Sequence, residues 1–204
     1  RFFDFLILGS GIAGLTCALQ LAKRGRVAIV TKKQKAESNT NYAQGGIAAV
    51  TSQEDSFEKH VQDTCKAGAG LCREEVVRTI VSEGPERIAS LIALGLSFSE
   101  REIPDSGGAR EWDLGKEGGH SKRRILHCKD MTGKVIEQAL LTAIAEDPNI
   151  EVLEDHFAID LITSEKASLP GESHCLGAYV LNVLTGKVEA IGSSFVILAT
   201  GGCG

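Results

Sequence analysis

The sequence predicts an α/β fold built on a parallel β-sheet, and three observations support this prediction. The apolar run 5–8 ends in the glycine-rich segment 9–14, which opens an Ala/Leu-rich helical pattern that continues to about Lys23. A second apolar run covers 27–30, so the chain begins with the order strand, glycine turn, helix, strand. A third apolar run, 195–198, ends in another glycine pair and is typical of a buried parallel strand. We therefore expect a Rossmann-like domain that begins with one βαβ unit.

The glycine turn between the first strand and the first helix has the spacing G-x-G-x-x-G, from Gly9 to Gly14. Gly9 would allow the tight turn, Gly11 would let a pyrophosphate approach the backbone, and Gly14 would let the helix pack closely on the sheet. A phosphate would bind at the helix N-terminus, where free N–H groups and the helix dipole favour an anion. The alternative is a purely structural turn. Its position between a strand and a helix, followed by another strand, favours a dinucleotide site.

The composition of the 204 residues narrows the class of protein. An apolar fraction of 43% is enough for a sizeable core, and 22 basic against 27 acidic residues argue against a general nucleic-acid binder. No apolar run has the length needed to span a bilayer, and no basic, cleavable leader is recognisable. We expect neither a nucleic-acid partner nor a membrane partner.

The six cysteines show neither a C-x-x-C pair nor the spacing of metal ligands, so we expect reduced thiols and no metal site. The chain begins just before one predicted strand and stops at Gly204, directly after another. Since a natural domain seldom ends flush with a buried strand and a glycine turn, we expect this chain to be a fragment.

The end of the second strand bears on which dinucleotide binds. Many dinucleotide folds place an Asp or Glu here to hydrogen-bond the adenosine ribose. This chain has Thr31 and Lys32 instead, and its next acid is Glu37. The ribose would then be held by a hydroxyl, by the backbone or by Lys32, or the ligand would sit differently. The departure weakens the case for NAD but leaves the phosphate site in place.

Two further segments have the composition of ligand-binding loops. In 38–49, small polar residues precede Gly45 and Gly46, a pattern that suits neither a good strand nor a stable helix but could wrap a ligand. In 116–127, an acid, two glycines, two histidines and several cations are crowded together, and the cations 122–124 would favour an anionic substrate. An ordinary polar loop and a solvated basic turn are the respective alternatives.

The remaining chain predicts the other elements of the domain. These are helices over 56–67, 73–82 and 133–146, and strands over 150–153, 157–162, 176–184 and 187–191. Gly84 and Pro85 break or restart the second helix, which then continues to a glycine stop at Gly95. The polar segment 99–112 is expected to be a long irregular loop. The strands over 176–184 and 187–191 are expected to form a hairpin around Gly186.

Four stretches of the sequence together resemble one known family. They are GSGIAG at 9–14, SNTNYAQGGIAA at 38–49, KEGGHSKRRILH at 116–127 and ATGG at 199–202. They are similar to the L-aspartate oxidase family of the succinate dehydrogenase/fumarate reductase flavoprotein superfamily. The resemblance runs the whole length of the chain but covers only the N-terminal part of such an enzyme.

This resemblance implies an incomplete α/β fold. It is a Rossmann-like FAD-binding domain with a parallel central sheet, the start of a glutathione-reductase-type flavoprotein with two nucleotide folds. The chain, residues 1–204, would be the N-terminal part of the FAD-binding domain. A capping domain, the rest of the FAD-binding domain and a C-terminal helical domain would follow.

The resemblance also implies non-covalent FAD as the cofactor. Residues 39–46 match the segment that runs along the flavin in this family. Within it, Asn39 stands where related succinate dehydrogenases carry a histidine joined covalently to the flavin, and asparagine cannot form that bond. Lys32 matches a basic residue after the second strand, and Ala158 would lie on the strand that offers its backbone to the adenine. The residues expected at the cofactor are Gly9, Ser10, Gly11, Ile12, Ala13, Gly14, Lys32, Asn39, Thr40, Asn41, Tyr42, Ala43, Gln44, Gly45, Gly46, Ala158 and Gly201.

The substrate implied by the resemblance is L-aspartate. Glu117 would pair with its α-ammonium group, because burying an unpaired amine is costly, and His120 would be a nearby contributor. Hydride would pass from the aspartate Cα to flavin N5 to give iminoaspartate, and O₂ or fumarate would accept the electrons. This is the first step of de novo NAD biosynthesis, with an expected functional link to quinolinate synthase.

Two other functions stay open at this point. One is a fumarate reductase or succinate dehydrogenase flavoprotein of the same fold, against which Asn39 and Glu117 argue. The other is a non-catalytic FAD-binding module. We expect the chain alone to be inactive, since most carboxylate-binding residues would lie beyond Gly204. A bacterial enzyme would be cytoplasmic and a plant enzyme plastidial.

Overall fold

The computed structural model describes residues 1–32, 39–104, 106–129 and 131–202. The chain divides into two compact units. Unit 1 consists of Arg1–Asn41 and Glu137–Gly204, and unit 2 consists of Tyr42–Ile136. Each unit has its own buried residues and is described by itself.

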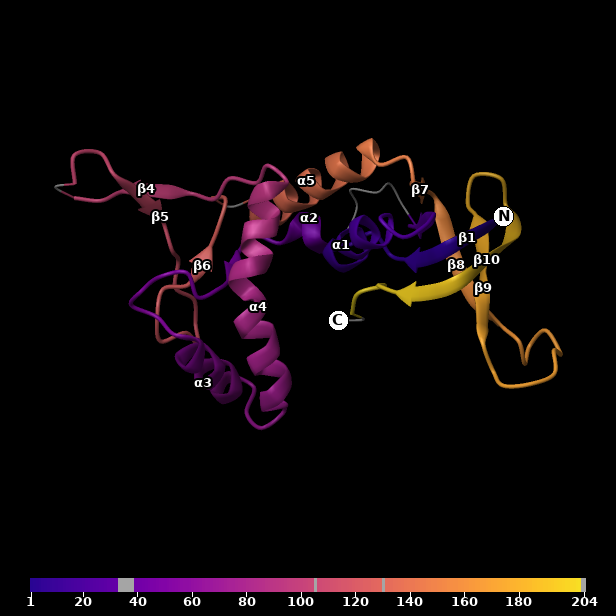
Figure 1. Cartoon of the computed structure of the whole chain (residues 1–204), viewed down its shortest axis with the longest axis horizontal. Coiled ribbons are helices and arrows are strands. Elements are labelled where there is room, and N and C mark those ends of the chain that lie inside the picture. The colour runs from indigo at the N-terminus through magenta and orange to yellow at the C-terminus, as the bar shows by residue number, and fades with distance from the viewer. Residues whose placement is uncertain (33–38, 105, 130, 203–204) are drawn as a thin grey trace. The chain divides into compact units, whose positions relative to one another are not determined.

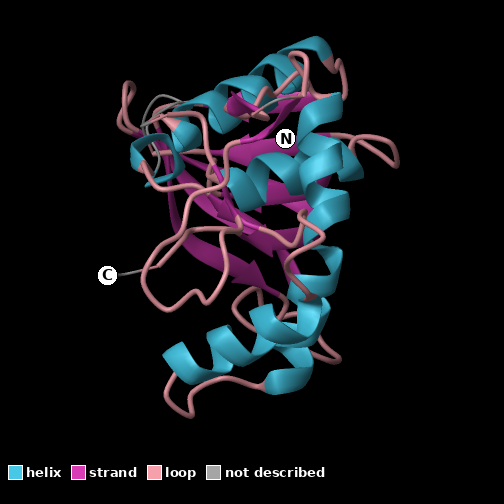
Figure 2. Cartoon of the chain, turned by 90° about the vertical axis from the view of Figure 1, so that its left-hand side faces the viewer, coloured by secondary structure: helices cyan, strands magenta, loops and turns pink. Residues whose placement is uncertain are grey.

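Unit 1 is built on a six-stranded sheet with the strand order β7-β2-β1-β10-β9-β8. The strands are β1 (Phe2–Leu8), β2 (Val27–Val30), β7 (Ile150–Leu153), β8 (His156–Thr163), β9 (Cys175–Asn182) and β10 (Lys187–Leu198), and they are labelled in Figure 1 and coloured magenta in Figure 2. The pairs β7·β2, β2·β1 and β1·β10 are parallel, whereas β9 is antiparallel to both of its neighbours. The predicted α/β fold is confirmed, and the central sheet, predicted to be parallel, is parallel in three of its five strand pairs.

The opening βαβ unit forms as predicted. Helix α1 (Ile12–Leu21) connects β1 to β2, and the two strands pair in parallel up to Leu8 opposite Val30. All four residues of β2 are buried, and α1 buries Gly14, Leu15 and Ala18. Burying a side chain such as Leu15 stabilises the fold by about 1.5–3 kcal/mol, so the apolar runs that predicted the unit also hold it together.

The core of unit 1 joins the parallel strands to the antiparallel ones. Leu6, Leu8 and Val30 from the parallel strands share one buried cluster with Val180 and Ile191 from the β9–β10 hairpin. This contact fixes the antiparallel strands against the strands that lead into the glycine turn.

The hairpin predicted around Gly186 is present, with Asn182 paired to Lys187 and a positive φ of 68° at Gly186. The separate strand predicted over 195–198 is instead the end of β10, which pairs antiparallel with β9 and then parallel with β1. Its expected burial is wrong in part, because Phe195 and Leu198 are each 63% exposed. Their side chains lie on a part of the strand that the described residues leave uncovered.

Unit 2 contains two helices packed side by side and two small two-stranded sheets (Figure 1). The elements lying wholly within unit 2 are β3 (Ile47–Ala48), α3 (Phe57–Ala67), α4 (Glu74–Ala93), β4 (Glu100–Glu102), β5 (Arg110–Trp112) and β6 (Ile125–Leu126). The short helix α2 (Asn39–Tyr42) ends in unit 2, and α5 (Thr132–Glu146) begins there. Arg78 of α4 binds Glu58 of α3 at 2.7 Å, which ties the two helices at their surface.

Two sequence predictions fail in unit 2. The helix predicted to break or restart at Gly84 and Pro85 does not do so, because α4 continues through both residues. A proline inside a helix removes one backbone hydrogen bond and costs about 3 kcal/mol, but burial of Val81 and Ile88 on either side offsets that cost. The segment 99–112 is not an irregular loop, because β4 and β5 pair in an antiparallel hairpin whose charged side chains face each other, Arg101 opposite Glu111.

Candidate functional site

At two of the three glycines in the turn of unit 1, other backbone atoms of the protein occupy the space that a side chain would need. Gly9 has a φ of +120°, and a Cβ there would lie 2.1 Å from the carbonyl oxygen of Ala199, just after β10. A Cβ at Gly14 would lie 2.0 Å from the carbonyl oxygen of Gly9. These glycines have the roles predicted for them, tight turning and close packing of the helix.

Gly11 differs from its two neighbours, because no described residue requires a glycine there. Its φ of −73° and ψ of 178° suit any residue, and the nearest heavy atom to an added Cβ is Thr40 Oγ1 at 3.6 Å. The open space beside this backbone is what a bound pyrophosphate would need.

The N-terminus of α1 has the electrostatics of an anion site. Gly11 is its N-cap and supplies no side-chain hydrogen bond, and the first turn contains no acidic residue. The Ile12 N–H donates to Thr40 Oγ1 at 3.1 Å. The N–H groups of Ala13 and Gly14 belong to the first turn, which has no intrahelical acceptors. The structure thus brings two predicted cofactor segments together at a helix terminus that favours negative charge.

The hydroxyl of Thr31, which follows β2, is engaged by the hydroxyl of Ser10 in the glycine turn after β1. Ser10 and Thr31 are buried, and their hydroxyl oxygens are hydrogen-bonded to each other at 2.8 Å. Lys32, the next residue, is exposed. Among the alternatives for the ribose, Lys32 and the backbone therefore fit better than the Thr31 hydroxyl, while Glu37 lies outside the described residues.

Two more predicted cofactor residues lie elsewhere in unit 1. Ala158 is on β8, which ends the sheet, and it pairs with Val180 next to an irregularity in the ladder. Its half-buried side chain packs against the core, so the backbone of this strand is the part that a ligand can reach. Gly201 is exposed, has a φ of +76° and follows the Ala199 carbonyl that closes on Gly9.

The polar segment around the predicted flavin contacts has more regular structure than expected. Residues 39–42 form the short helix α2, and 47–48 form β3, which pairs with β6. Between them, Ala43 accepts a hydrogen bond from the Gly133 N–H at 2.9 Å, while Tyr42, Ala43 and Gln44 are exposed. The backbone is held by the start of α5, and the side chains remain accessible.

In unit 2, the structure brings Glu117 against the glycine pair of this segment. A Cβ at Gly45 would lie 2.9 Å from Glu117 Oε1, so the carboxylate rests beside the bare Gly45 backbone. A Cβ at Gly46 would lie 2.4 Å from the Leu126 carbonyl oxygen, so Gly46 allows the close approach of β6. Glu117 itself is exposed. The residue predicted for the substrate amine therefore lies beside the segment predicted for the flavin.

His120 belongs to a buried network of charges in unit 2. Its Nδ1 lies 3.1 Å from Nη1 of Arg124, a fully buried arginine. Two bonds join Arg124 to Asp55, from Nε at 2.8 Å and from Nη2 at 2.9 Å, and Nη1 donates to Asp63 at 2.7 Å. The prediction that Arg124 would favour an anionic substrate is therefore wrong, because a guanidinium taken out of water needs carboxylate partners of its own.

The charges of this network are stabilised by one another. Burial would raise the pKa of the Asp63 carboxyl, but hydrogen bonds from Ser121 and Arg124 outweigh it and bring that pKa down to about 2. Burial opposes the charge on Asp55 and on Arg124 as well, yet their mutual hydrogen bonds lower the pKa of Asp55 and raise that of Arg124. All three groups are ionised near neutral pH.

Sequence reasoning missed Asp55, Asp63 and His60 as members of this network. His60 is buried, its ring lies 5.7 Å from that of His120, and burial followed by the charge of Arg124 lowers its pKa. The one available signal was the polarity of His60 and Asp63 within a helix that buries Val61. Their role depends on Arg124, which lies 69 residues from Asp55 and 61 residues from Asp63 in the sequence.

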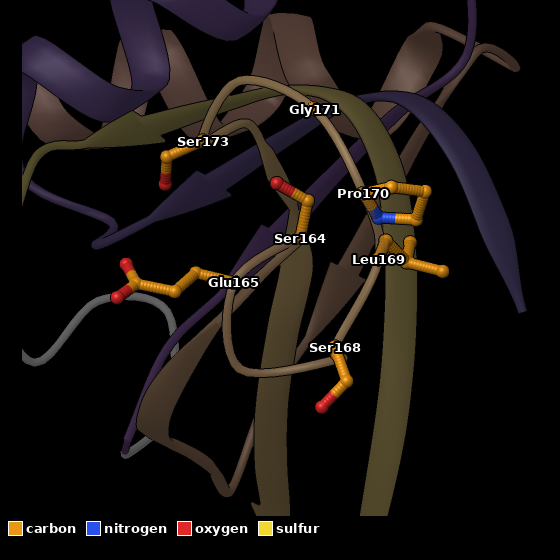
Figure 3. A pocket seen from close by; sticks show the side chains of 7 residues that line it. All are labelled: Ser164, Glu165, Ser168, Leu169, Pro170, Gly171 and Ser173. Carbon is orange, nitrogen blue, oxygen red and sulfur yellow. The ribbon is translucent and has the colours of Figure 1, made fainter.

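Two surface hollows of the described residues are lined by neither Glu117 nor His120. One, of about 420 Å³, is formed by the loop 164–173 between β8 and β9, and its lining includes three serines, Glu165 and the apolar Leu169 and Pro170 (Figure 3). The other, of about 810 Å³, lies in unit 2 between the β4–β5 hairpin and the residues on either side of the Glu117–His120 turn. Neither includes a residue predicted for the cofactor, but the second is lined by Lys122 and Arg123, two of the cations predicted to favour an anionic substrate.

The described residues contain neither a metal-binding group of side chains nor a membrane-spanning helix. No group of three or more His, Cys, Asp or Glu side chains there is arranged to hold a metal ion. None of the helices described is both long and apolar enough to cross a membrane.

Comparison with known proteins adds to this geometry. Residues 4–204 match the family model described as FAD binding domain. The chain is 51% identical over 204 residues to L-aspartate oxidase 2-a, chloroplastic, of Nicotiana tabacum, and 46% identical over 200 residues to L-aspartate oxidase of Pseudomonas aeruginosa. These matches cover 100% and 98% of this chain but 30% and 37% of the two relatives, so the chain spans about a third of their length.

Solved structures agree with the fold. A quinol fumarate reductase of E. coli matches with a TM-score of 0.86 at 30% identity, over 100% of this chain and 33% of that chain. The Sdh1 complex of Mycobacterium smegmatis matches with a TM-score of 0.85 at 28% identity, over 100% of this chain and 35% of that chain.

Proposed function

The chain belongs to the FAD binding domain family, and on this premise we propose that the protein that carries it oxidises L-aspartate to iminoaspartate with non-covalently bound FAD. Relatives named L-aspartate oxidase match along the whole chain at 46–51% identity, which supports the proposal. FAD, when bound, supplies the acceptor for the hydride and returns the electrons to O₂ or fumarate. The residues of this chain supply binding, orientation and charge.

The residues of unit 1 suit a dinucleotide. The open space at Gly11 and the acid-free first turn of α1 suit a pyrophosphate. Thr40 lies beside that turn, and Asn39 cannot form the covalent flavin bond that a histidine would make. We propose that Gly9–Gly14, Lys32, Ala158 and Gly201 contact the nucleotide part of FAD.

We propose that the segment 39–46, of which 42–46 belong to unit 2, runs along the flavin, and that Glu117 of unit 2 recognises the substrate amine. The observation that carries the proposal is the position of the Glu117 carboxylate beside the Gly45 backbone. An α-ammonium group paired with Glu117 would lie next to this segment, which orients the Cα–H bond for transfer. A dicarboxylate without an amine would leave the Glu117 charge without a partner, and that loss disfavours it.

The remaining two thirds of such an enzyme would contain the capping domain, the rest of the FAD-binding domain and a helical domain. We propose that most carboxylate-binding residues lie there and that residues 1–204 alone do not turn over aspartate. We also propose a functional link to quinolinate synthase, as the consumer of iminoaspartate. Plant relatives named chloroplastic and relatives from bacteria support a plastid location in a plant and a cytoplasmic one in a bacterium.

The test uses the full-length protein with FAD, assayed for oxidation of L-aspartate and of succinate. We expect aspartate oxidation to dominate, and faster oxidation of succinate would instead favour a fumarate reductase or succinate dehydrogenase. Bound FAD without turnover of either would favour a non-catalytic module. Robust aspartate oxidation by residues 1–204 alone would contradict the division of the active site.

The variant Glu117→Gln tests the role of this carboxylate. We expect the KM for aspartate to rise about tenfold or more, since a hydrogen bond to a charged group contributes about 1.5–3 kcal/mol. Binding of succinate, which has no amine, should not weaken. The matched control is Glu111→Gln, which removes an exposed carboxylate paired with Arg101 in the same unit. Equal effects of Glu117→Gln on aspartate and succinate would refute amine recognition.

A further inference from the structure

Among the residues that the structure describes, His120 is the candidate site residue that the side chain of the buried Arg124 contacts. Of the five N–H groups of a guanidinium, Nε–H and one Nη2–H of Arg124 go to Asp55. The two Nη1–H groups face Asp63 at 2.7 Å and Nδ1 of His120 at 3.1 Å. Four of the five donors are thus directed, and the guanidinium cannot turn without breaking bonds to both carboxylates.

The direction of the Arg124–His120 bond follows from chemistry. An arginine side chain has donors and no acceptor, so Nδ1 of His120 must be the acceptor and carries no proton. A neutral imidazole with an unprotonated Nδ1 carries its proton on Nε2. Nε2 makes no hydrogen bond with a described residue, so this N–H is available to a ligand.

The backbone around His120 is held by the same network. Asp63 accepts hydrogen bonds from both the N–H and the hydroxyl of Ser121 at 2.8 Å, and it also accepts the bond from Arg124. The His120 N–H donates to the carbonyl oxygen of Glu117 at 3.3 Å. The turn from Glu117 to Ser121 is therefore fixed at its carboxyl end by the carboxylate of Asp63.

We infer that Arg124 is a positioning residue, which holds His120 in the neutral form protonated on Nε2 so that this N–H donates to a carboxylate oxygen of the substrate. The inference rests on the proposed function for the identity of the substrate, but not for the protonation state of His120. Glu117 and His120 then recognise opposite charges of one amino acid. The carboxylate of Glu117 accepts from the ammonium, and Nε2 of His120 donates to a carboxylate.

The first experiment reads the protonation state of His120 directly. Full-length protein labelled with ¹⁵N-histidine is examined by NMR, and His120 is assigned by comparison with His120→Gln. We expect a protonated Nε2 and an unprotonated Nδ1 in the wild type, and loss of this single form in Arg124→Lys. A protonated Nδ1 in the wild type would overturn the inference, whether or not the protein oxidises aspartate.

The second experiment is a double-mutant cycle in the full-length protein with FAD. Arg124→Lys keeps the charge between Asp55 and Asp63 but cannot also reach His120 with a fixed fork. We expect Arg124→Lys to raise the KM for aspartate about tenfold with little change in kcat, as for lost uniform binding. In the His120→Asn background the same substitution should have no further effect on KM. A merely structural arginine would cause the same loss in both backgrounds.

Three controls keep the outcome interpretable. Arg78→Lys changes an arginine that also binds two carboxylates, Glu58 and Glu74, but has no contact with His120, and its KM should stay at the wild-type value. His120→Gln keeps a donor near the Nε2 position and should bind aspartate better than His120→Asn, and the reverse order would contradict the inference. If Arg124→Lys does not fold, as judged by flavin content, this comparison and the NMR measurement still decide.

Discussion

Substitution of Gly11 and of Gly14 by alanine separates cofactor binding from stability within one glycine turn. At Gly11 the backbone suits any residue and an added Cβ meets nothing closer than 3.6 Å, so we expect the unfolding free energy without FAD to change by less than about 0.5 kcal/mol. At Gly14 the Cβ would lie 2.0 Å from the Gly9 carbonyl oxygen, so helix and turn must separate at a cost of about 1–3 kcal/mol or more.

The effect of Gly11→Ala on FAD is expected to be large. A methyl group there would occupy the space proposed for the pyrophosphate, and we expect FAD to bind at least about tenfold more weakly, a loss of about 1.4 kcal/mol. At an FAD concentration of about 100 times the wild-type Kd, bound FAD stabilises the wild type by about 2.7 kcal/mol. The same concentration is only about 10 times the Kd of the variant and stabilises it by about 1.4 kcal/mol.

The assay is denaturant unfolding of the full-length protein with and without FAD, together with titration of the flavin absorbance near about 450 nm. Gly11→Ala should keep the stability of the FAD-free protein and lose about half of the stabilisation by FAD. Gly14→Ala should lose stability before FAD is added. If Gly11→Ala binds FAD as the wild type does, no pyrophosphate lies beside this residue and the assignment of the turn is wrong.

Three further predictions concern unit 2. Gly46→Ala should destabilise the protein by about 1–3 kcal/mol in denaturant unfolding, because its Cβ would meet the Leu126 carbonyl at 2.4 Å, whereas Gly45→Ala should be milder because only a flexible carboxylate must move. The ionised Asp63 carboxylate stabilises the fold above pH 3.8, and this stabilisation is lost as the pH falls toward 2. Since its side chain is 16% exposed, the loss in unfolding free energy is on the order of 1–2 kcal/mol. Asp63→Asn should flatten the dependence of the unfolding free energy on pH between pH 3.8 and 2. Ser56→Ala should cost about 1 kcal/mol by the same measurement, since Ser56 caps α3 through the Lys59 N–H, and an unchanged midpoint would show that the cap contributes nothing.

The local elements of unit 1 were predictable because their signals are local. The strand over 27–30 is fully buried and continuously apolar. The glycine spacing at 9–14 reports a backbone conformation set within the turn itself, with a positive φ at Gly9 and Gly14 packed against the Gly9 carbonyl. The hairpin at Gly186 needs a positive φ that glycine supplies. In each case the residue type and the backbone conformation that it allows are adjacent in the chain.

The failures in unit 2 share a different cause, which is that distant residues decide the outcome. Pro85 would break an isolated helix, but α4 is held by packing on both sides of it. The pairing of β4 with β5 depends on charged residues whose partners are set by register. Arg124 looked like an anion-binding cation because Asp55 and Asp63 lie some sixty to seventy residues away in sequence, which no local pattern reveals.

The position of those two acids bears on how Glu117 can serve as a substrate ligand at all. Arg124 follows the turn that contains Glu117 by a few residues, and an unpaired arginine this close in the chain could pair with Glu117 and compete with an incoming ammonium group. Asp55 and Asp63 instead take up the Arg124 guanidinium, and Glu117 forms no ion pair with any residue that the structure describes. By pairing with Arg124, Asp55 and Asp63 leave the exposed carboxylate of Glu117 available. Substituting Asp55 or Asp63 should therefore impair recognition of the substrate amine, although neither acid is proposed to contact that amine. The Arg124 guanidinium would then lack one carboxylate partner and could pair with Glu117 instead.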